Sequence, residues 1–165
     1  MERARDAAAA KAALRRELRA RRRAIPAAER ERASRRVVEK ALAGIDWTSV
    51  RSAHVYRSVA AWGEVDTAPL VEAIRERWRS VRIVSPDVTA NQPLPEERFD
   101  VIVVPVLGFD DANFRLGLGA GFYDRLLAAQ PQAFTIGLAY AWANVGDRLP
   151  HEPHDMPLDR VVTDA

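Results

Sequence analysis

The chain has 165 residues, of which 48% are hydrophobic and 29% are charged. This length is enough to bury one sizeable core, and we expect a single domain over residues 1–165. There is no cysteine, which excludes disulfides, thiolate metal sites and cysteine nucleophiles and suits a cytoplasmic protein. No apolar run approaches the roughly 20 residues that cross a bilayer, and residues 1–23 lack the apolar stretch of a secretory signal, so we expect no membrane segment.

Charge is distributed unevenly along the chain. Residues 1–40 contain 14 Lys or Arg and 6 Asp or Glu, a balance of +8, whereas residues 41–165 contain 11 and 17, a balance of −6. We therefore expect the two parts to attract each other. The cationic region could bind nucleic acid, a membrane surface or a phosphorylated small molecule. Nucleic acid is the alternative we do not favour, because no helix-turn-helix pattern or basic strand interleaved with aromatic residues accompanies the charge.

Two helices are predicted in the N-terminal region. Residues 4–24 are rich in Ala, Leu, Arg and Glu and contain neither Gly nor Pro, and Pro26 ends this helix. A second helix is predicted over residues 27–43 and ends at Gly44. Its apolar residues recur at steps of three and four and predict one buried stripe: Ala33, Val37, Val38, Ala41 and Leu42.

Strands and helices alternate in the rest of the chain. The predicted strands are residues 52–59, 81–85, 100–106, 134–140 and 160–164. The runs 81–85 and 100–106 are almost continuously apolar, and we expect them to be core strands covered on both faces. A further helix is predicted to begin after Thr67 as N-cap, with Pro69 in its first turn. This alternation predicts an α/β fold with a mainly parallel sheet, helices on both faces, and sites at the carboxyl ends of strands.

The segment VPVLGFDDANFRLGLGAGFYDR (104–125) is the most informative stretch. It places Gly117, Gly119 and Gly121, three of the chain's eight glycines, between a strand and a helix. Alternating glycines expose backbone N–H groups, and the helix start adds a positive dipole end, so this loop suits a phosphate, with Arg115 as a cation beside it. The alternative is a tight turn whose glycines only permit close packing. Asp124 could bind hydrated Mg²⁺ or simply cap the first helical turn.

A second candidate region is LPHEPHDMPLDRVVTD (149–164), in which three prolines stiffen a loop. It carries the ionisable residues His151, Glu152, His154, Asp155 and Asp159. His151 and His154 could suggest zinc, but no third ligand of known spacing accompanies them, and hydrogen-bonding loop histidines are the favoured alternative. We expect Asp155 to be a ligand of Mg²⁺ if the fold brings it beside Asp124.

Two smaller features add to these. Lys11 and Arg15 are four residues apart on the first helix, so both could reach one polyphosphate, although a solvated helix face would have the same pattern. Glu64 follows the first strand, at the edge where α/β sheets bind ligands, and could equally be an ordinary loop carboxylate.

In this order, the segments resemble the 5-formyltetrahydrofolate cyclo-ligase family, also called 5,10-methenyltetrahydrofolate synthetase. The family signature, approximately VPGLAFD…RLGYGGGYYDR, is similar to VPVLGFD (104–110) and RLGLGAGFYDR (115–125). The family's late EPHDVPLD…VVTE is similar to EPHDMPLDRVVTD (152–164). KAALRRELRARR (11–22) and GEVDT (63–67) also resemble family segments, so the resemblance extends over the whole chain.

This resemblance implies an enzyme that uses ATP and Mg²⁺ to convert 5-formyltetrahydrofolate to 5,10-methenyltetrahydrofolate, with release of ADP and phosphate. ATP would phosphorylate the formyl oxygen, and attack of N10 followed by loss of phosphate would form the methenyl bridge. The resemblance also implies the three-layer α/β arrangement of the ribose-5-phosphate isomerase and coenzyme A transferase type. We expect a cytoplasmic monomer whose partners are small molecules.

Site residues follow by similarity to the family's motifs. Lys11 and Arg15 would contact the ATP phosphates, Asp124 and Asp155 would hold Mg²⁺, and Val59 and Glu64 would contact folate, with Glu64 hydrogen-bonded to the pterin ring. The nucleotide loop would comprise Arg115, Leu116, Gly117, Leu118, Gly119, Ala120, Gly121, Phe122 and Tyr123. Within it, Arg115 and Tyr123 would be the catalytic residues, and Leu118 to Phe122 would lie where folate and ATP meet.

The chain departs from the family pattern at several positions. Leu118 stands where the family has a tyrosine or a basic residue, Ala120 replaces a glycine or lysine, and Phe122 replaces a tyrosine. The segment between the strands at 81–86 and 97–105 is shortened to residues 87–96, where the family has a longer wall of the folate pocket. The reaction could proceed in a more open pocket, or the chain could be a diverged paralogue that acts on another small substrate.

Overall fold

The computed structural model describes residues 2–88 and 91–165. Its centre is a five-stranded sheet in the order β2-β1-β3-β6-β7, in which every neighbouring pair is parallel. The strands are β1 (Ser52–Val55), β2 (Arg82–Val84), β3 (Val101–Pro105), β6 (Phe134–Leu138) and β7 (Arg160–Val162). A separate antiparallel ribbon is formed by β4 (Gly108–Phe109) and β5 (Arg115–Leu116).

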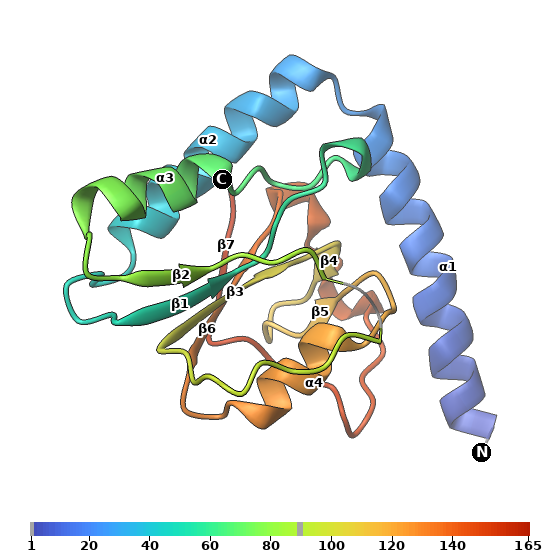
Figure 1. Cartoon of the computed structure of the whole chain (residues 1–165). Coiled ribbons are helices and arrows are strands. Elements are labelled where there is room, and N and C mark those ends of the chain that lie inside the picture. Colours follow the sequence, from blue (N-terminus) through green and yellow to red (C-terminus); the bar gives the residue numbers. More distant parts are fainter. Residues whose placement is uncertain (1, 89–90) are drawn as a thin grey trace.

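Helices cover both faces of this sheet (Figure 1). Two of them pack on one face, α2 (Ala27–Ala43) and α3 (Ala68–Arg77), and α4 (Phe122–Ala129) packs on the other. Helix α1 (Glu2–Ala24) runs along one side of the molecule, past the β4–β5 ribbon. Three short 3-10 turns complete the elements: η1 (Ala60–Trp62), η2 (Ala141–Ala143) and η3 (Gly146–Arg148). The predicted α/β fold with a parallel sheet is therefore confirmed.

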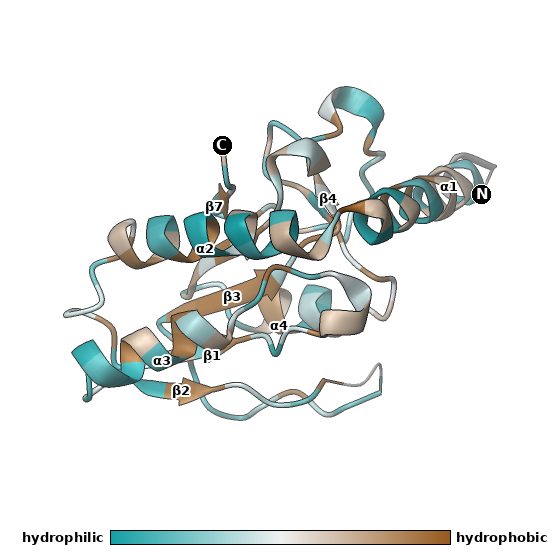
Figure 2. Cartoon of the chain, turned by 90° about the horizontal axis from the view of Figure 1, so that it is seen from above, coloured by the Kyte–Doolittle hydropathy of each residue, from teal (hydrophilic) through white to brown (hydrophobic). Residues whose placement is uncertain are grey.

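The central strand β3 shows why this sequence forms a layered core. Its side chains alternate, so that Val101 and Val103 pack with α2 and α3, whereas Ile102 and Val104 pack with α4. Each of these four residues is at most 2% exposed. Figure 2 shows β3 as almost entirely hydrophobic, whereas α1 and α2 alternate between hydrophilic and hydrophobic segments. A strand with two buried faces and amphipathic helices beside it are what the apolar patterns predicted.

Helix α1 is anchored by a smaller apolar cluster and by charge. Leu14 and Leu18 pack into a cluster with residues of the ribbon and the loops near it, among them Leu107 and Leu116. Lys11 forms ion pairs with acidic residues of the C-terminal segment, as described below. The predicted attraction between the basic N-terminal region and the acidic remainder is thus realised in direct contacts.

Helix boundaries match the sequence-based prediction closely, whereas the strands are shorter than predicted. The expectation that residues 81–85 form a core strand covered on both faces is only partly met, since Ile83 and Val84 pack against the two core clusters but the strand is not fully buried. Strand β2 lies at the edge of the sheet, Arg82 is exposed, and the next two residues are only partly buried. An apolar run does not distinguish an edge strand from a central one. Thr67 is the N-cap of α3 as predicted, but its hydroxyl donates to the carbonyl of Tyr56, and Asp66 Oδ1 accepts the N–H of Ala68 instead.

Candidate active site

A cleft of about 850 Å³ lies at the carboxyl ends of the parallel strands. Its walls come from α1, from the loops that follow β1 and β2, from the end of β3, from the glycine loop before α4, and from residues 152–155. This is the edge where open α/β sheets bind ligands. Most of the predicted site residues line it: Lys11, Arg15, Val59, Glu64, every residue from Arg115 to Asp124, and Asp155.

The glycine loop is held in place by the first helix. Gly119 and Gly121 have φ angles of 96° and 76°, which only glycine adopts readily, and Gly121 is the N-cap of α4. Arg15 Nε donates to the carbonyl of Gly117 at 2.9 Å, and Arg19 Nη2 donates to that of Leu118 at 3.0 Å. Carbonyl groups of the loop thus face α1. Two cations of α1 thus bind the glycine loop, whereas Arg16, Arg21 and Arg23 of the same helix are exposed.

Arg115 is a buried cation beneath this loop. Its side chain is 4% exposed, and Nη2 lies 3.1 Å from Asp124 Oδ1. Nε has no hydrogen-bond partner among residues 2–88 and 91–165. Gly117 leaves room for the guanidinium, since a Cβ there would lie 2.5 Å from Arg115 Nη1. Burial lowers the pKa of Arg115, which nearby Asp124 opposes, so the protein holds a positive charge at the base of the cleft.

Tyr123 lies next to this cation at the start of α4. The guanidinium carbon of Arg115 is 5.8 Å from the centre of the Tyr123 ring. Burial raises the pKa of Tyr123, so the side chain is a neutral phenol at physiological pH. A neutral phenol can donate one hydrogen bond into the cleft but cannot serve as a base there.

Lys11 crosses from α1 to the C-terminal segment. Its Nζ lies 2.6 Å from both Glu152 Oε2 and Asp155 Oδ2. Burial alone would lower the pKa of Lys11, but the two carboxylates outweigh it and the pKa is raised. Burial would likewise raise the pKa of Asp155, yet Lys11 and the backbone N–H of Glu152, 2.7 Å from Oδ2, lower it. Asp155 therefore stays ionised beside the ammonium group of Lys11.

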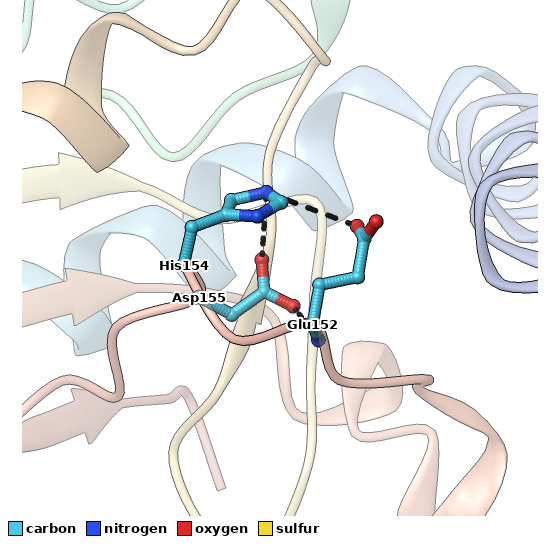
Figure 3. A group of neighbouring side chains, drawn as sticks. All are labelled: Glu152, His154 and Asp155. Carbon is cyan, nitrogen blue, oxygen red and sulfur yellow. Dashed lines mark hydrogen bonds and ion pairs between the residues drawn. The ribbon is translucent and has the colours of Figure 1, made fainter. Parts of the chain in front are cut away.

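The same segment contains a group of side chains that could hold a metal ion. Ligand atoms of Glu152, His154 and Asp155 lie within 4.8 Å of one another (Figure 3). His154 Nε2 is 3.9 Å from Glu152 Oε2 and 3.8 Å from Asp155 Oδ1. Carboxylate oxygens suit Mg²⁺, and Asp124, which contacts Arg115, supplies another in the same cleft. His151 does not join this group: its Nε2 lies 2.5 Å from Asp110 Oδ2.

The wall on the β1 side holds the two residues predicted to contact folate. Glu64 Oε2 accepts the backbone N–H of Val59 at 2.8 Å, so the two are in direct contact. Burial raises the pKa of Glu64, opposed by that N–H group and by the charge of Arg22. Glu64 is partly buried and lines the cleft, and its carboxylate is a suitable acceptor for N–H groups of a bound ring.

Sequence reasoning did not identify several residues of this cleft. Trp62 and Arg57 line it from the loop after β1. Glu152 and His154, which the sequence placed in a candidate loop without giving them a role, line it from the C-terminal segment. An aromatic residue two positions before the predicted Glu64 was the available signal for Trp62. Of the shortened segment 87–96, residues 89–90 lie outside the described residues, and Asp87 Oδ1 lies 3.3 Å from Arg57 Nη1 at the cleft edge.

Comparisons with known proteins agree with the motifs. A sequence model of the 5-formyltetrahydrofolate cyclo-ligase family matches residues 77–164, more than half of the chain. The chain belongs to the 5-formyltetrahydrofolate cyclo-ligase family. Both long motifs that carried the resemblance, in 104–125 and 152–164, lie within the matched residues.

A curated relative supports this membership. The 5-formyltetrahydrofolate cyclo-ligase of Escherichia coli (strain K12) is 31% identical over 134 residues, which cover 61% of this chain and 72% of that protein. The 134 aligned positions include only 61% of this 165-residue chain, so some of them are gaps in this chain. At those positions the Escherichia coli cyclo-ligase has residues that this chain lacks. This agrees with a chain that is internally shorter than its relative.

Solved structures of the family share the fold. A 5,10-methenyltetrahydrofolate synthetase from Mycoplasma pneumoniae superposes with a TM-score of 0.79 at 24% identity, covering 94% of this chain and 99% of that one. The 5,10-methenyltetrahydrofolate synthetase of Aquifex aeolicus gives a TM-score of 0.75 at 27% identity, covering 93% and 89%. No helix in the described ranges is long and apolar enough to cross a membrane.

Proposed function

We propose that this protein converts 5-formyltetrahydrofolate to 5,10-methenyltetrahydrofolate in a reaction that consumes ATP and depends on Mg²⁺. The observation that carries the proposal is the cleft, in which a glycine loop with buried Arg115 shares one space with the Val59–Glu64 wall. An anion site and an acceptor for a ring with N–H groups thus lie side by side, in a chain of the cyclo-ligase family.

The chemistry requires charge stabilisation and positioning rather than a protein nucleophile. The formyl oxygen attacks the γ-phosphorus of ATP, and the bond from that phosphorus to the β,γ-bridging oxygen breaks to release ADP. N10 then attacks the activated formyl carbon and loses its proton. The C–O bond to the phosphoryl group breaks to release phosphate and leave the methenyl bridge. Cations and backbone N–H groups that face the transferring phosphoryl group lower the barrier of such a step.

The residues of the chain fit these roles. We assign Lys11, Arg15 and the loop from Arg115 to Tyr123 to ATP, with Arg115 and Tyr123 next to the transferred group. Leu118 to Phe122 would separate the two substrates, and Val59 and Glu64 would hold the pterin. Bound Mg²⁺ would neutralise phosphate charge, and the carboxylates of Asp124 and Asp155 are the candidates to hold it. Each carboxylate contacts a cation, Arg115 or Lys11, so metal binding and rearrangement of these ion pairs are coupled.

A direct assay tests this proposal. Purified protein with 5-formyltetrahydrofolate and Mg²⁺ should give a near-ultraviolet absorbance rise of the methenyl product only when ATP is present. Asp124→Ala should abolish this rise while the protein remains folded. Asp147→Ala, which removes an exposed carboxylate of η3 outside the cleft, is the matched control and should leave turnover unchanged. Unchanged turnover in Asp124→Ala would contradict the assigned metal role.

A second candidate is an ATP-dependent enzyme of this family that acts on another small substrate. The observation that favours it is the shorter aligned chain, since residues missing from a cleft wall change what the cleft accepts. ATP binding without any binding of 5-formyltetrahydrofolate would support this candidate. A cytoplasmic location and a monomeric state complete the proposal, and cell fractionation and light scattering on a sizing column test them.

A further inference from the structure

Trp62 is a large apolar side chain that the fold leaves half exposed at the cleft. Its exposed fraction is 50%, and in the described part of the chain Met156 is the other exposed large hydrophobic residue. Trp62 lines the cleft, whereas Met156 does not. An exposed indole at a cleft wall leaves apolar surface in water that a flat ligand ring can cover.

The turn that carries Trp62 is fixed on its inner side. The backbone N–H of Trp62 donates to the carbonyl of Val59 at 3.0 Å. Gly63 follows with a left-handed φ of 68°, and its carbonyl accepts the Tyr140 hydroxyl at 2.9 Å. A Cβ on Gly63 would lie 3.2 Å from Arg22 Cγ, so the inner side of the turn is filled. The backbone of the turn is therefore held in place, and the exposed indole that it carries lines the cleft in the absence of a ligand.

Trp62 and Glu64 lie at different depths of the same wall. Glu64 is partly buried and fixed by the N–H of Val59, whereas Trp62 is exposed. In 5-formyltetrahydrofolate the pterin bears the N–H groups that suit a carboxylate, and the p-aminobenzoyl ring follows it along the molecule. With the pterin at Glu64, the p-aminobenzoyl ring is the next flat group toward the cleft edge.

We propose that Trp62 stacks on the p-aminobenzoyl ring and is a specificity-determining residue for the folate substrate. This inference rests on the proposed function and deepens it, because it names the residue that selects the second ring. Since the turn after β1 also supplies Val59, one rigid segment would contact both rings of the substrate.

Three variants at this position separate a stacking contact from simple apolar bulk. Trp62→Ala should raise KM and Kd for 5-formyltetrahydrofolate about ten-fold, with KM for ATP unchanged. Trp62→Phe retains a ring and is the conservative variant that should stay close to the wild type. Trp62→Leu retains apolar area without a ring, and its Kd should exceed that of Trp62→Phe by between about two- and ten-fold. Circular dichroism melts check that all three are folded.

The outcomes are distinguishable from failure of the proposed function. If wild-type protein shows ATP-dependent turnover, unchanged folate KM in Trp62→Ala overturns the stacking proposal, as does a rise confined to KM for ATP. If wild-type protein shows no turnover, the proposed function fails, and calorimetric titration with 5-formyltetrahydrofolate decides the role of Trp62. Wild-type binding that weakens in Trp62→Ala supports stacking, and absence of binding to the wild type overturns it.

Discussion

Replacement of Gly117 by alanine probes how the glycine loop is built around Arg115. The backbone of Gly117 lies outside the left-handed region, so this position requires glycine for space. An alanine Cβ would lie 2.5 Å from Arg115 Nη1. The guanidinium would have to move by about 1 Å to reach ordinary contact, and a move of this size is enough to break the 3.1 Å bond from Nη2 to Asp124, which is the outcome we predict.

The expected effect follows from the loss of this charged hydrogen bond. Hydrogen bonds to charged groups contribute about 1.5–3 kcal/mol, so kcat/KM for ATP in Gly117→Ala should fall between about 10- and 150-fold. The assay is the near-ultraviolet rise of the methenyl product at fixed 5-formyltetrahydrofolate and varied ATP. Wild-type kcat/KM for ATP in folded Gly117→Ala would refute the idea that Arg115 must stay in place for phosphoryl transfer.

Gly146→Ala is the matched control. Gly146 has a left-handed φ of 60°, has no atom within 4 Å of the added Cβ, and lies outside the cleft. The strain of an alanine in this conformation costs about 1–2 kcal/mol, so the melting temperature should fall by roughly 3–6 °C without loss of kcat/KM. The control thus separates a general loss of stability from a specific loss of ATP use.

Three further predictions concern charge. Burial lowers the pKa of His54 from 6.5 to about 4, so the unfolded chain takes up a proton at a higher pH than the folded protein does. The free energy of unfolding should therefore fall by about 3 kcal/mol between pH 6.5 and 4, and the melting temperature should fall with it. His54→Phe should remove this fall in melting temperature. Burial raises the pKa of Glu64, so its ionised form destabilises the fold, and Glu64→Gln should melt higher at pH 7 but not below pH 4.5. Asp155→Asn should raise the Mg²⁺ concentration for half-maximal turnover about ten-fold in a metal titration.

Each of these has an outcome that contradicts it. If the melting temperature of His54→Phe still falls between pH 6.5 and 4, another group controls the stability in this range. A Glu64→Gln protein that melts lower than the wild type at pH 7 would mean that Glu64 is stabilised by its neighbours in spite of burial. A Mg²⁺ requirement unchanged in Asp155→Asn would remove Asp155 from the metal site.

The parts of the fold that were predictable are those with strong local patterns. Helices α1 and α2 follow from helix-forming residues interrupted by Pro26, and β3 follows from an apolar run that is buried on both faces. The edge position of β2 was not predictable, because sheet order depends on contacts between distant segments. Arg82 inside the run was the signal of an exposed face.

The candidate site was predictable where the spacing of charged residues places them on one face of a helix. Lys11 and Arg15 do share one helix face, and both line the cleft. Their partners were not predictable: Arg15 contacts a carbonyl 102 residues away, and Lys11 lies between two carboxylates. The 3-10 turn that presents Trp62 has no periodic pattern, so only the fold places that residue at the cleft.

Helix α1 supplies Lys11 and Arg15 to one wall of the cleft. It lies beside the central sheet without belonging to it (Figure 1). Its contacts near the cleft run through Lys11, Arg15 and Arg19, and they join it to segments about a hundred residues or more away in sequence. A ligand that bridges these cations and the glycine loop therefore also fastens the helix to the body of the protein. Amide hydrogen exchange in α1 should therefore slow when ATP binds, because the bound ligand raises the local stability of the helix. The exchange rate of α1 is thus a measure of whether the cleft is occupied.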